Sequence, residues 1–161
     1  METIQLANEE FLPHVCALVN EGHTVSIRAR GYSMRPFIEN DRDVAILGKS
    51  NIYKVGDVVL AEIAPGHYVL HRIDAIKGNH VRLRGDGNYP GTEHCMMGDI
   101  RAIMCAVERK GKRWDTNGKV WKIYSWIWVR LLPVRRYLLA LYRLICLHQL
   151  PNRVKRLFKQ Y

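Results

Sequence analysis

The spacing of apolar residues changes twice along the chain. Apolar residues recur at helical spacing over residues 8–22, and Gly22 can take the left-handed conformation that ends a helix. From residue 24 to residue 108 the period is two, as in half-buried strands. Beyond residue 118 the helical period returns. The pattern predicts a short helix, a β region and a helical C-terminal region.

The β region contains many short apolar runs separated by polar turns with Gly, Pro, Asn and Asp. Strands are predicted over residues 24–29, 44–47, 58–61, 68–76, 80–83 and 100–107. Short strands in close succession favour an antiparallel sheet. We expect a mainly β fold, in the form of an antiparallel sheet or partly open barrel, with helices at both ends of the chain.

The domain boundaries follow these changes of period. We expect an N-terminal helix within residues 1–23, a β domain over 24–108, a charged linker over 109–118 and a helical tail over 119–161. Pro133 divides the tail into two helices, predicted over residues 120–132 and 134–150.

The charge is confined to the tail. The 161 residues carry a net charge of +10, but residues 1–118 hold 15 Lys and Arg against 15 Asp and Glu. Residues 119–161 hold the other 10 basic residues and no acidic residue. All four tryptophans lie at 114, 121, 126 and 128. Aromatic and basic residues on an otherwise apolar helix are typical of helices that lie on a membrane surface.

The N-terminal segment and the cysteines indicate the cellular location and the state of the thiols. Residues 1–20 hold three glutamates and no long apolar stretch, which is unlike a signal peptide or a membrane span. The four cysteines are scattered and form no Cys-x-x-Cys pair, which argues against structural zinc and a disulfide framework. We expect reduced thiols, no metal or cofactor, and a cytoplasmic protein peripheral to the membrane.

Three short stretches carry the candidate chemistry. Gly-Tyr-Ser-Met-Arg-Pro contains Ser33, Val-Leu-His-Arg-Ile contains His71, and Arg-Gly-Asp-Gly-Asn contains Asp86. A serine hydroxyl becomes a good nucleophile when a base takes its proton, and an acid that orients the base completes the set. An imidazole can act as that base at neutral pH without the burial that a lysine needs.

These stretches resemble the boxes of a known superfamily, which joins type I signal peptidases to the self-cleaving SOS-response repressors. Gly-x-Ser-Met-x-Pro is similar to the nucleophile box and Gly-Asp-Gly-Asn to the box that follows the base. The base position holds histidine, as in the archaeal and endoplasmic-reticulum signal peptidases. The resemblance covers roughly residues 24–108.

The resemblance implies a mostly β peptidase with Ser33 as nucleophile, His71 as general base and Asp86 as orienting acid. Glu93 is the reserve acid, because related enzymes have a second acidic residue after this box. Many signal peptidases have a hydroxyl residue two positions before the nucleophile, where this chain has glycine, as the repressors do. Positions expected to support the site or the oxyanion are Gly31, Met34 and Asn88.

Each candidate residue also has a simpler interpretation. Ser33 alone would be an ordinary turn serine, and His71 would be a core histidine with its hydrogen bonds satisfied. Asp86 would cap its own loop, as turn aspartates commonly do. A lysine base has no candidate in the relevant strand. A metal site formed by His67, His71, His94 and Cys95 lacks recognisable ligand spacing.

The tail has several possible roles. Binding to a membrane surface ranks first, followed by docking on an integral membrane partner, nucleic-acid binding, and service as a helical cap on the β domain. We expect no nucleic-acid partner, and the sequence leaves the oligomeric state open. The residues expected at the membrane surface are Lys122, Trp126, Arg130, Arg135, Arg136 and Arg143.

Together these features predict a signal-peptidase-like serine endopeptidase that cleaves a signal or leader peptide at or near a membrane. Two alternatives stay open. One is a self-cleaving regulatory peptidase of the repressor type, although the 30 residues before the nucleophile box leave no room for a DNA-binding helix pair. The other is a membrane-associated adaptor that keeps the fold without catalysis.

Overall fold

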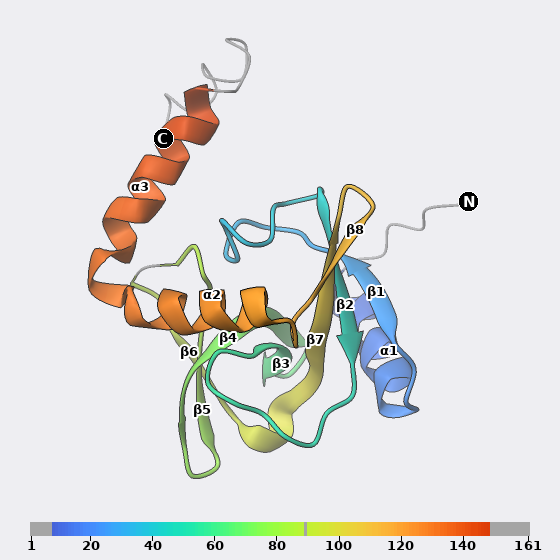
Figure 1. Ribbon diagram of the computed structural model, residues 1–161. Coiled ribbons are helices and arrows are strands. Elements are labelled where there is room, and N and C mark those ends of the chain that lie inside the picture. Colours follow the sequence, from blue (N-terminus) through green and yellow to red (C-terminus); the bar gives the residue numbers. More distant parts are fainter. Residues whose placement is uncertain (1–7, 89, 149–161) are drawn as a thin grey trace.

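A computed structural model describes residues 8–88 and 90–148 (Figure 1). Its elements, in chain order, are α1 (Asn8–Asn20), β1 (Val25–Arg28), β2 (Asp43–Gly48), β3 (Val58–Ala64), β4 (His67–Lys77), β5 (His80–Arg84), β6 (Glu93–Met96), a 3₁₀ turn (Met97–Asp99), β7 (Ile100–Arg109), β8 (Lys112–Asp115), α2 (Lys119–Arg130) and α3 (Leu132–His148). The mainly β fold with helices at both ends is confirmed.

All strand pairs are antiparallel, and seven strands follow the order β1-β2-β7-β3-β4-β5-β6, with β8 paired to β7. Within the described residues β1 and β6 do not pair with one another, so the sheet is a partly open barrel. Bulges in β3, β4 and β7 allow this long sheet to curve.

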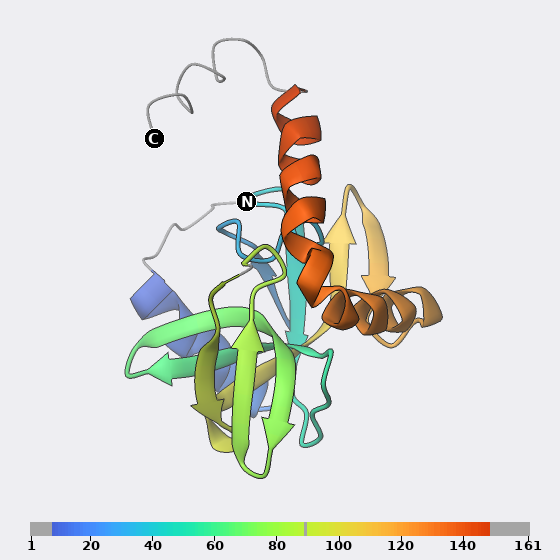
Figure 2. The same cartoon turned by 90° about the vertical axis from the view of Figure 1, so that its left-hand side faces the viewer.

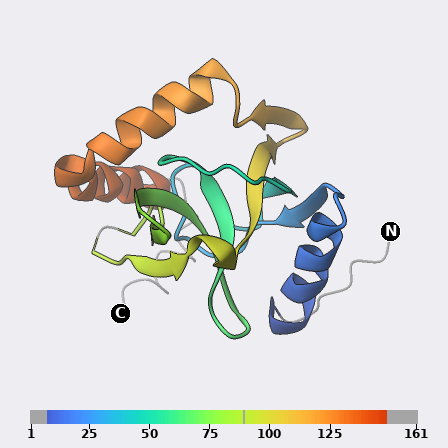
Figure 3. The ribbon, with the colours of Figure 1, turned by 90° about the horizontal axis from the view of Figure 1, so that it is seen from below.

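Two apolar clusters form the core. The first packs α1 on the sheet through Leu12, Val15 and Val19, and it includes Trp121 of α2. The second lies around β3, β4 and β5 and contains Val59, Ile73, Val81 and Leu83. Helices α1 and α2 lie on opposite sides of the molecule (Figure 3).

The sequence pattern missed two strands, which carry few buried apolar residues. In β6 only Cys95 is buried, and all four residues of β8 are exposed. The charged segment 109–118, predicted as a linker, instead forms the end of β7 and a hairpin to β8. Lys110 and Gly111 adopt positive φ in its turn, which gives the hairpin its tight connection.

The two C-terminal helices meet at Leu131, and Pro133 is the second residue of α3. Proline is tolerated there because the N–H groups of the first helical turn have no partner within the helix. The end of the second predicted helix, at residue 150, lies outside the described residues. Figure 2 shows α3 extending beyond the sheet. In the described residues, no helix is both long and apolar enough to cross a membrane.

Candidate active site

Ser33 lies in a turn between β1 and β2. Gly31 adopts φ +95°, and its N–H donates to Asn40 Oδ1 at 2.8 Å. The N–H of Arg35 donates to the carbonyl of Tyr32 at 3.2 Å, which closes the chain around the serine. Met34 is buried in the core. The buried methionine fixes the turn, while Ser33 itself stays partly accessible to solvent.

The loop that follows β5 packs directly on this turn. The N–H of Gly87 donates to the Ser33 carbonyl at 2.7 Å, and the N–H of Asn88 donates to the Gly85 carbonyl at 3.1 Å. A Cβ atom at Gly85 would lie 2.5 Å from the Ser33 carbonyl oxygen. Only glycine at position 85 permits this close approach of the two backbones.

His71 is buried in β4, and its ring contacts Glu93 at the start of β6. Ile73 pairs with Leu83, which pairs with Glu93, so these three residues share one face of the sheet. His71 lies two residues before Ile73 and therefore shares that face. His71 Nδ1 lies 2.9 Å from Glu93 Oε2. Because an ionised carboxylate only accepts hydrogen bonds, this contact favours, for a neutral ring, the tautomer with the proton on Nδ1 and an acceptor at Nε2.

Asp86 belongs to the opposite face, with Arg72. Arg72 pairs with Arg84, and Asp86 follows Arg84 by two residues. Arg72 Nε and Nη2 donate to the two Asp86 carboxylate oxygens at 2.8 and 2.6 Å. Its Nη1 donates to Ser125 Oγ of α2 at 2.6 Å and to the Gly56 carbonyl at 2.7 Å. Both members of the ion pair are buried.

The prediction that Asp86 orients His71 is therefore wrong in this structure. The alternation of side chains along a strand places these residues on different faces, and Arg72 occupies both oxygens of Asp86. Burial alone would lower the pKa of Arg72, but the charge of Asp86 and its hydrogen bonds raise it. The reserve acid, Glu93, is the carboxylate that contacts His71.

Gly85 relates the position of Ser33 to that of His71. Arg72 pairs with Arg84, and continuing this register by one residue sets Gly85 opposite His71. Opposite residues of an antiparallel pair point to the same face. A Cβ at Gly85 would lie 3.1 Å from Ser33 Cβ, so the serine occupies the space on that face beside the histidine. Ser33 therefore lies on the face of the sheet that carries the contact between His71 and Glu93.

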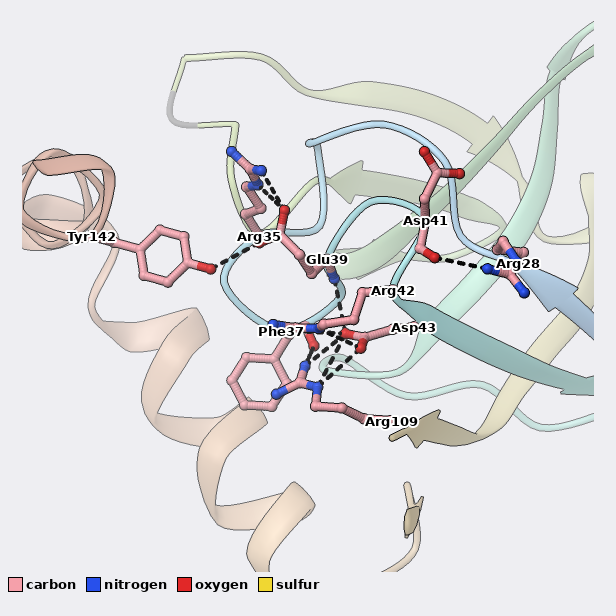
Figure 4. A network of polar contacts seen from close by, with 9 residues as sticks. All are labelled: Arg28, Arg35, Phe37, Glu39, Asp41, Arg42, Asp43, Arg109 and Tyr142. Carbon is pink, nitrogen blue, oxygen red and sulfur yellow. Dashed lines mark hydrogen bonds and ion pairs between the residues drawn. The ribbon is translucent and has the colours of Figure 1, made fainter. Parts of the chain in front are cut away.

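A polar network holds the segment between the nucleophile turn and β2 (Figure 4). Arg35 Nε donates to Glu39 Oε1 at 2.7 Å, and the Glu39 N–H donates to Asp43 Oδ2 at 2.9 Å. Arg109 of β7 donates from Nη2 to Asp43 Oδ2 at 2.8 Å. Tyr142 of α3 donates its hydroxyl to Glu39 Oε2 at 2.9 Å. The network ties this segment to β2, β7 and α3.

Helix α2 packs against the same region. The rings of Phe37 and Trp121 meet edge to face, with centroids 5.0 Å apart, and Phe37 also stacks on Tyr124. Together with the hydrogen bond between Arg72 and Ser125, these contacts place α2 directly behind the candidate site. The C-terminal helices therefore brace the segment that carries the serine.

Of the six residues predicted to face a membrane, five are exposed and one is buried. Arg135 is only 2% exposed; it donates to the Trp128 carbonyl, and its guanidinium lies 5.0 Å from the centre of the Trp128 ring. Burial lowers its pKa. Arg135 joins α3 to α2, so the prediction that it faces a membrane surface is wrong. The exposed residues are Lys122, Trp126, Arg130, Arg136 and Arg143.

Arg72 and Ser125 are contributors that the sequence analysis missed. Arg72 follows His71 directly, and a charged residue beside the base in an apolar strand could have indicated a role in the site. No feature of the sequence indicates Ser125, because a single serine in a helix forms no pattern. Within the described part of the chain, no three His, Cys, Asp or Glu side chains are grouped to hold a metal ion. Cys16, Cys95 and Cys105 are free thiols, and the Cys146 side chain lies outside the described ones.

A partly open β-barrel that has a turn serine and a carboxylate-bound histidine on one face of the sheet is an arrangement typical of serine peptidases. The comparison with known families agrees: the Peptidase S24-like family matches residues 2–97, more than half of the chain. The protein belongs to this family, and so to the superfamily of signal peptidases and self-cleaving repressors. No curated protein matches it in sequence. The match contains Ser33, His71 and Glu93 and ends before the C-terminal helices.

Proposed function

We propose that the protein is an active serine endopeptidase with Ser33 as nucleophile, His71 as general base and Glu93 as the acid that orients His71. The observation that carries the proposal is the hydrogen bond between His71 Nδ1 and Glu93, on the face of the sheet that Ser33 adjoins. This bond fixes the tautomer in which Nε2 can accept a proton.

In the proposed reaction, His71 Nε2 takes the proton of Ser33 as the hydroxyl oxygen attacks a peptide carbonyl carbon. The imidazolium, stabilised by Glu93, then gives that proton to the leaving amine, and an acyl-enzyme remains. Water, deprotonated by His71, hydrolyses the ester. The Ser33 N–H is our candidate donor to the oxyanion, since the Gly31 N–H already donates to Asn40.

The proposed substrate is a signal or leader peptide cleaved at or near a membrane. The resemblance to signal peptidases supports this substrate and cleavage after small residues. An extended peptide could add as a strand at the edge of the open sheet. We place the cleavage at the cytoplasmic face of the membrane, and protection of the catalytic domain from protease added to intact cells, with digestion after lysis, is the expected result.

The first test is labelling of Ser33 by a serine-directed phosphonate. We expect the purified protein to be labelled, and Ser33→Ala and His71→Ala to lose labelling by at least about 100-fold. Ser33→Ala removes the hydroxyl, and His71→Ala leaves a hydroxyl that reacts slowly because no base activates it. Mass spectrometry of the labelled peptide gives the position.

A matched control is Ser26→Ala, which removes the hydroxyl of an exposed serine in β1. It should label as the parent does. Absence of labelling in a folded parent protein, with membrane present, would contradict the peptidase proposal and favour the adaptor.

The family also includes self-cleaving repressors, which favours a second candidate function for the same site. A self-cleaving protein should shorten at a rate independent of its concentration, and Ser33→Ala should abolish the cut. An endopeptidase acting on another chain should leave itself intact and process added peptide.

A further inference from the structure

One side of α3 packs on the protein, and the other carries exposed apolar side chains. Leu139 and Arg135 are buried, and Tyr142 donates to Glu39, so these three residues mark the inner side. They are spaced by three and four residues, which places them on one helical face. The exposed side begins at Leu138, which is three residues from Arg135 and four from Tyr142, and extends around the helix to Leu144.

Six large apolar residues form the outer side, with exposed fractions between 39% and 65%. They recur at spacings of three and four residues over the helix. We call them the α3 stripe: Val134, Tyr137, Leu138, Leu141, Leu144 and Ile145. Contiguous apolar patches larger than a few hundred Å² are rare on soluble monomers and mark interaction surfaces.

Positive charge borders the stripe. The Arg136 guanidinium stacks 4.4 Å from the centre of the Tyr137 ring, and Arg143 is exposed about 100° around the helix from Leu144. Exposed basic residues also lie on α2, where the Arg130 guanidinium stacks 3.9 Å from the centre of the exposed Trp126 ring. Residues 119–161 contain no acidic residue, while the rest of the chain is neutral. A surface that joins apolar, aromatic and cationic groups complements an anionic lipid surface.

We propose that the α3 stripe inserts into the lipid–water boundary of an anionic bilayer, with Arg136 and Arg143 at the level of the lipid phosphates. In this proposal the helix lies in the membrane plane, because Arg135, Arg136 and Arg143 interrupt the apolar sequence of its described residues. This docking is independent of the peptidase proposal, because the stripe shares no residue with Ser33, His71 and Glu93.

The charge pattern favours lipid over other occupants. A second copy of the chain would bring a second cluster of like charge against the first, which opposes association. Residues 149–161 carry four further basic residues and no acid, so they do not neutralise Arg136 and Arg143 either. An anionic bilayer offers apolar lipid tails to the stripe and negatively charged phosphates to the arginines.

The docking would also orient the catalytic region. Tyr142 links α3 to Glu39, and Arg135 links α3 to α2, which packs behind the site. None of these contacts involves a residue of the α3 stripe. Insertion of the stripe therefore leaves them intact and holds the nucleophile turn at a fixed position relative to the bilayer.

The test is cosedimentation of the full chain with vesicles. We expect binding to vesicles of phosphatidylcholine with phosphatidylglycerol and much weaker binding to phosphatidylcholine alone. Leu144→Asp, at the most exposed position of the stripe, should weaken binding by about tenfold or more, since it removes apolar insertion and adds repulsion. Arg136→Gln and Arg143→Gln should each weaken it about fivefold on anionic vesicles.

The matched control is Leu18→Asp, the same change at an exposed leucine of α1 on the far side of the molecule (Figure 1). It should bind as the parent does, and circular dichroism should show all variants folded. The proposal is overturned if the folded parent does not bind anionic vesicles or if both Asp variants bind equally well. It is also overturned if, without lipid, the parent is a dimer that Leu144→Asp dissociates, which would assign the stripe to a second copy.

Discussion

At the scale of single residues, the identity of the acid is decided by which face of the sheet a side chain occupies. Asp86 and Glu93 are both close to His71 in the fold, but only Glu93 shares its face. Asp86 instead forms a buried ion pair with Arg72. A buried pair is costly to break, because the remaining charge is left without a partner in a poorly solvated site.

Because Glu93 and Asp86 have different roles, replacing each by its amide should have different effects. Glu93→Gln should lower the rate of phosphonate labelling by about 10³-fold, because a neutral amide does not stabilise the imidazolium, and should change stability by less than about 1 kcal/mol. Asp86→Asn should lower the free energy of unfolding by about 3–5 kcal/mol, since it leaves the Arg72 charge unpaired. Labelling kinetics and urea unfolding measure the two effects.

If Asp86 were the catalytic acid, Asp86→Asn would reduce labelling in protein that is still folded, and Glu93→Gln would label normally. That outcome would contradict the assignment.

At the scale of elements, Asp43 fastens the nucleophile segment to the sheet. It begins β2 and pairs with Arg109 of β7 in the sheet register. Burial alone would raise the pKa of Asp43, but hydrogen bonds from Arg42, Arg109 and the Glu39 N–H lower it to about 2. The ionised carboxylate therefore stabilises the folded chain.

The lowered pKa predicts acid sensitivity. Because the folded pKa lies below the unfolded value of 3.8, the stabilisation is present above about pH 4 and is lost as the pH falls towards 2. The contribution is about 2 kcal/mol. Urea unfolding between neutral pH and pH 2 should show the parent losing this stability, while Asp43→Asn, less stable at neutral pH, should lose about 2 kcal/mol less over the same range.

Equal acid dependence in the parent and in Asp43→Asn would show that the carboxylate does not supply this stabilisation.

At the scale of the whole molecule, the excess positive charge and the candidate active site lie in separate parts of the chain. The first 118 residues are neutral and carry the candidate site, and the excess charge lies in the C-terminal region. The two parts meet where α2 packs on Phe37 and Arg72. This arrangement allows the outer face of the helices to bind a surface while the inner face braces the site.

Salt should therefore affect docking and chemistry differently. Raising the ionic strength from about 0.1 M to about 1 M shortens the Debye length from about 10 to about 3 Å and screens exposed charges. Binding to anionic vesicles should fall by at least about tenfold, while phosphonate labelling without lipid should change by less than about twofold. Parallel loss of both would indicate that salt disturbs the fold rather than the docking.

Features that depend on local pattern could be predicted before the structure was known. The period of two along the central region defined most strands, and Pro133 and the helical period defined the C-terminal helices. Ser33 and His71 could be proposed because their boxes are short contiguous stretches. These features are readable because side chains alternate along a strand and recur along a helix within a few residues.

Contacts between residues far apart in the sequence became visible in the folded protein alone. Glu93 contacts His71 because β6 pairs with β5, a pairing that the sequence did not show because β6 has a single buried residue. Arg135 is buried because α3 folds back on Trp128, although its helical position resembles that of a surface arginine. Such choices depend on register and packing between elements, and neither is encoded in the period of any one segment.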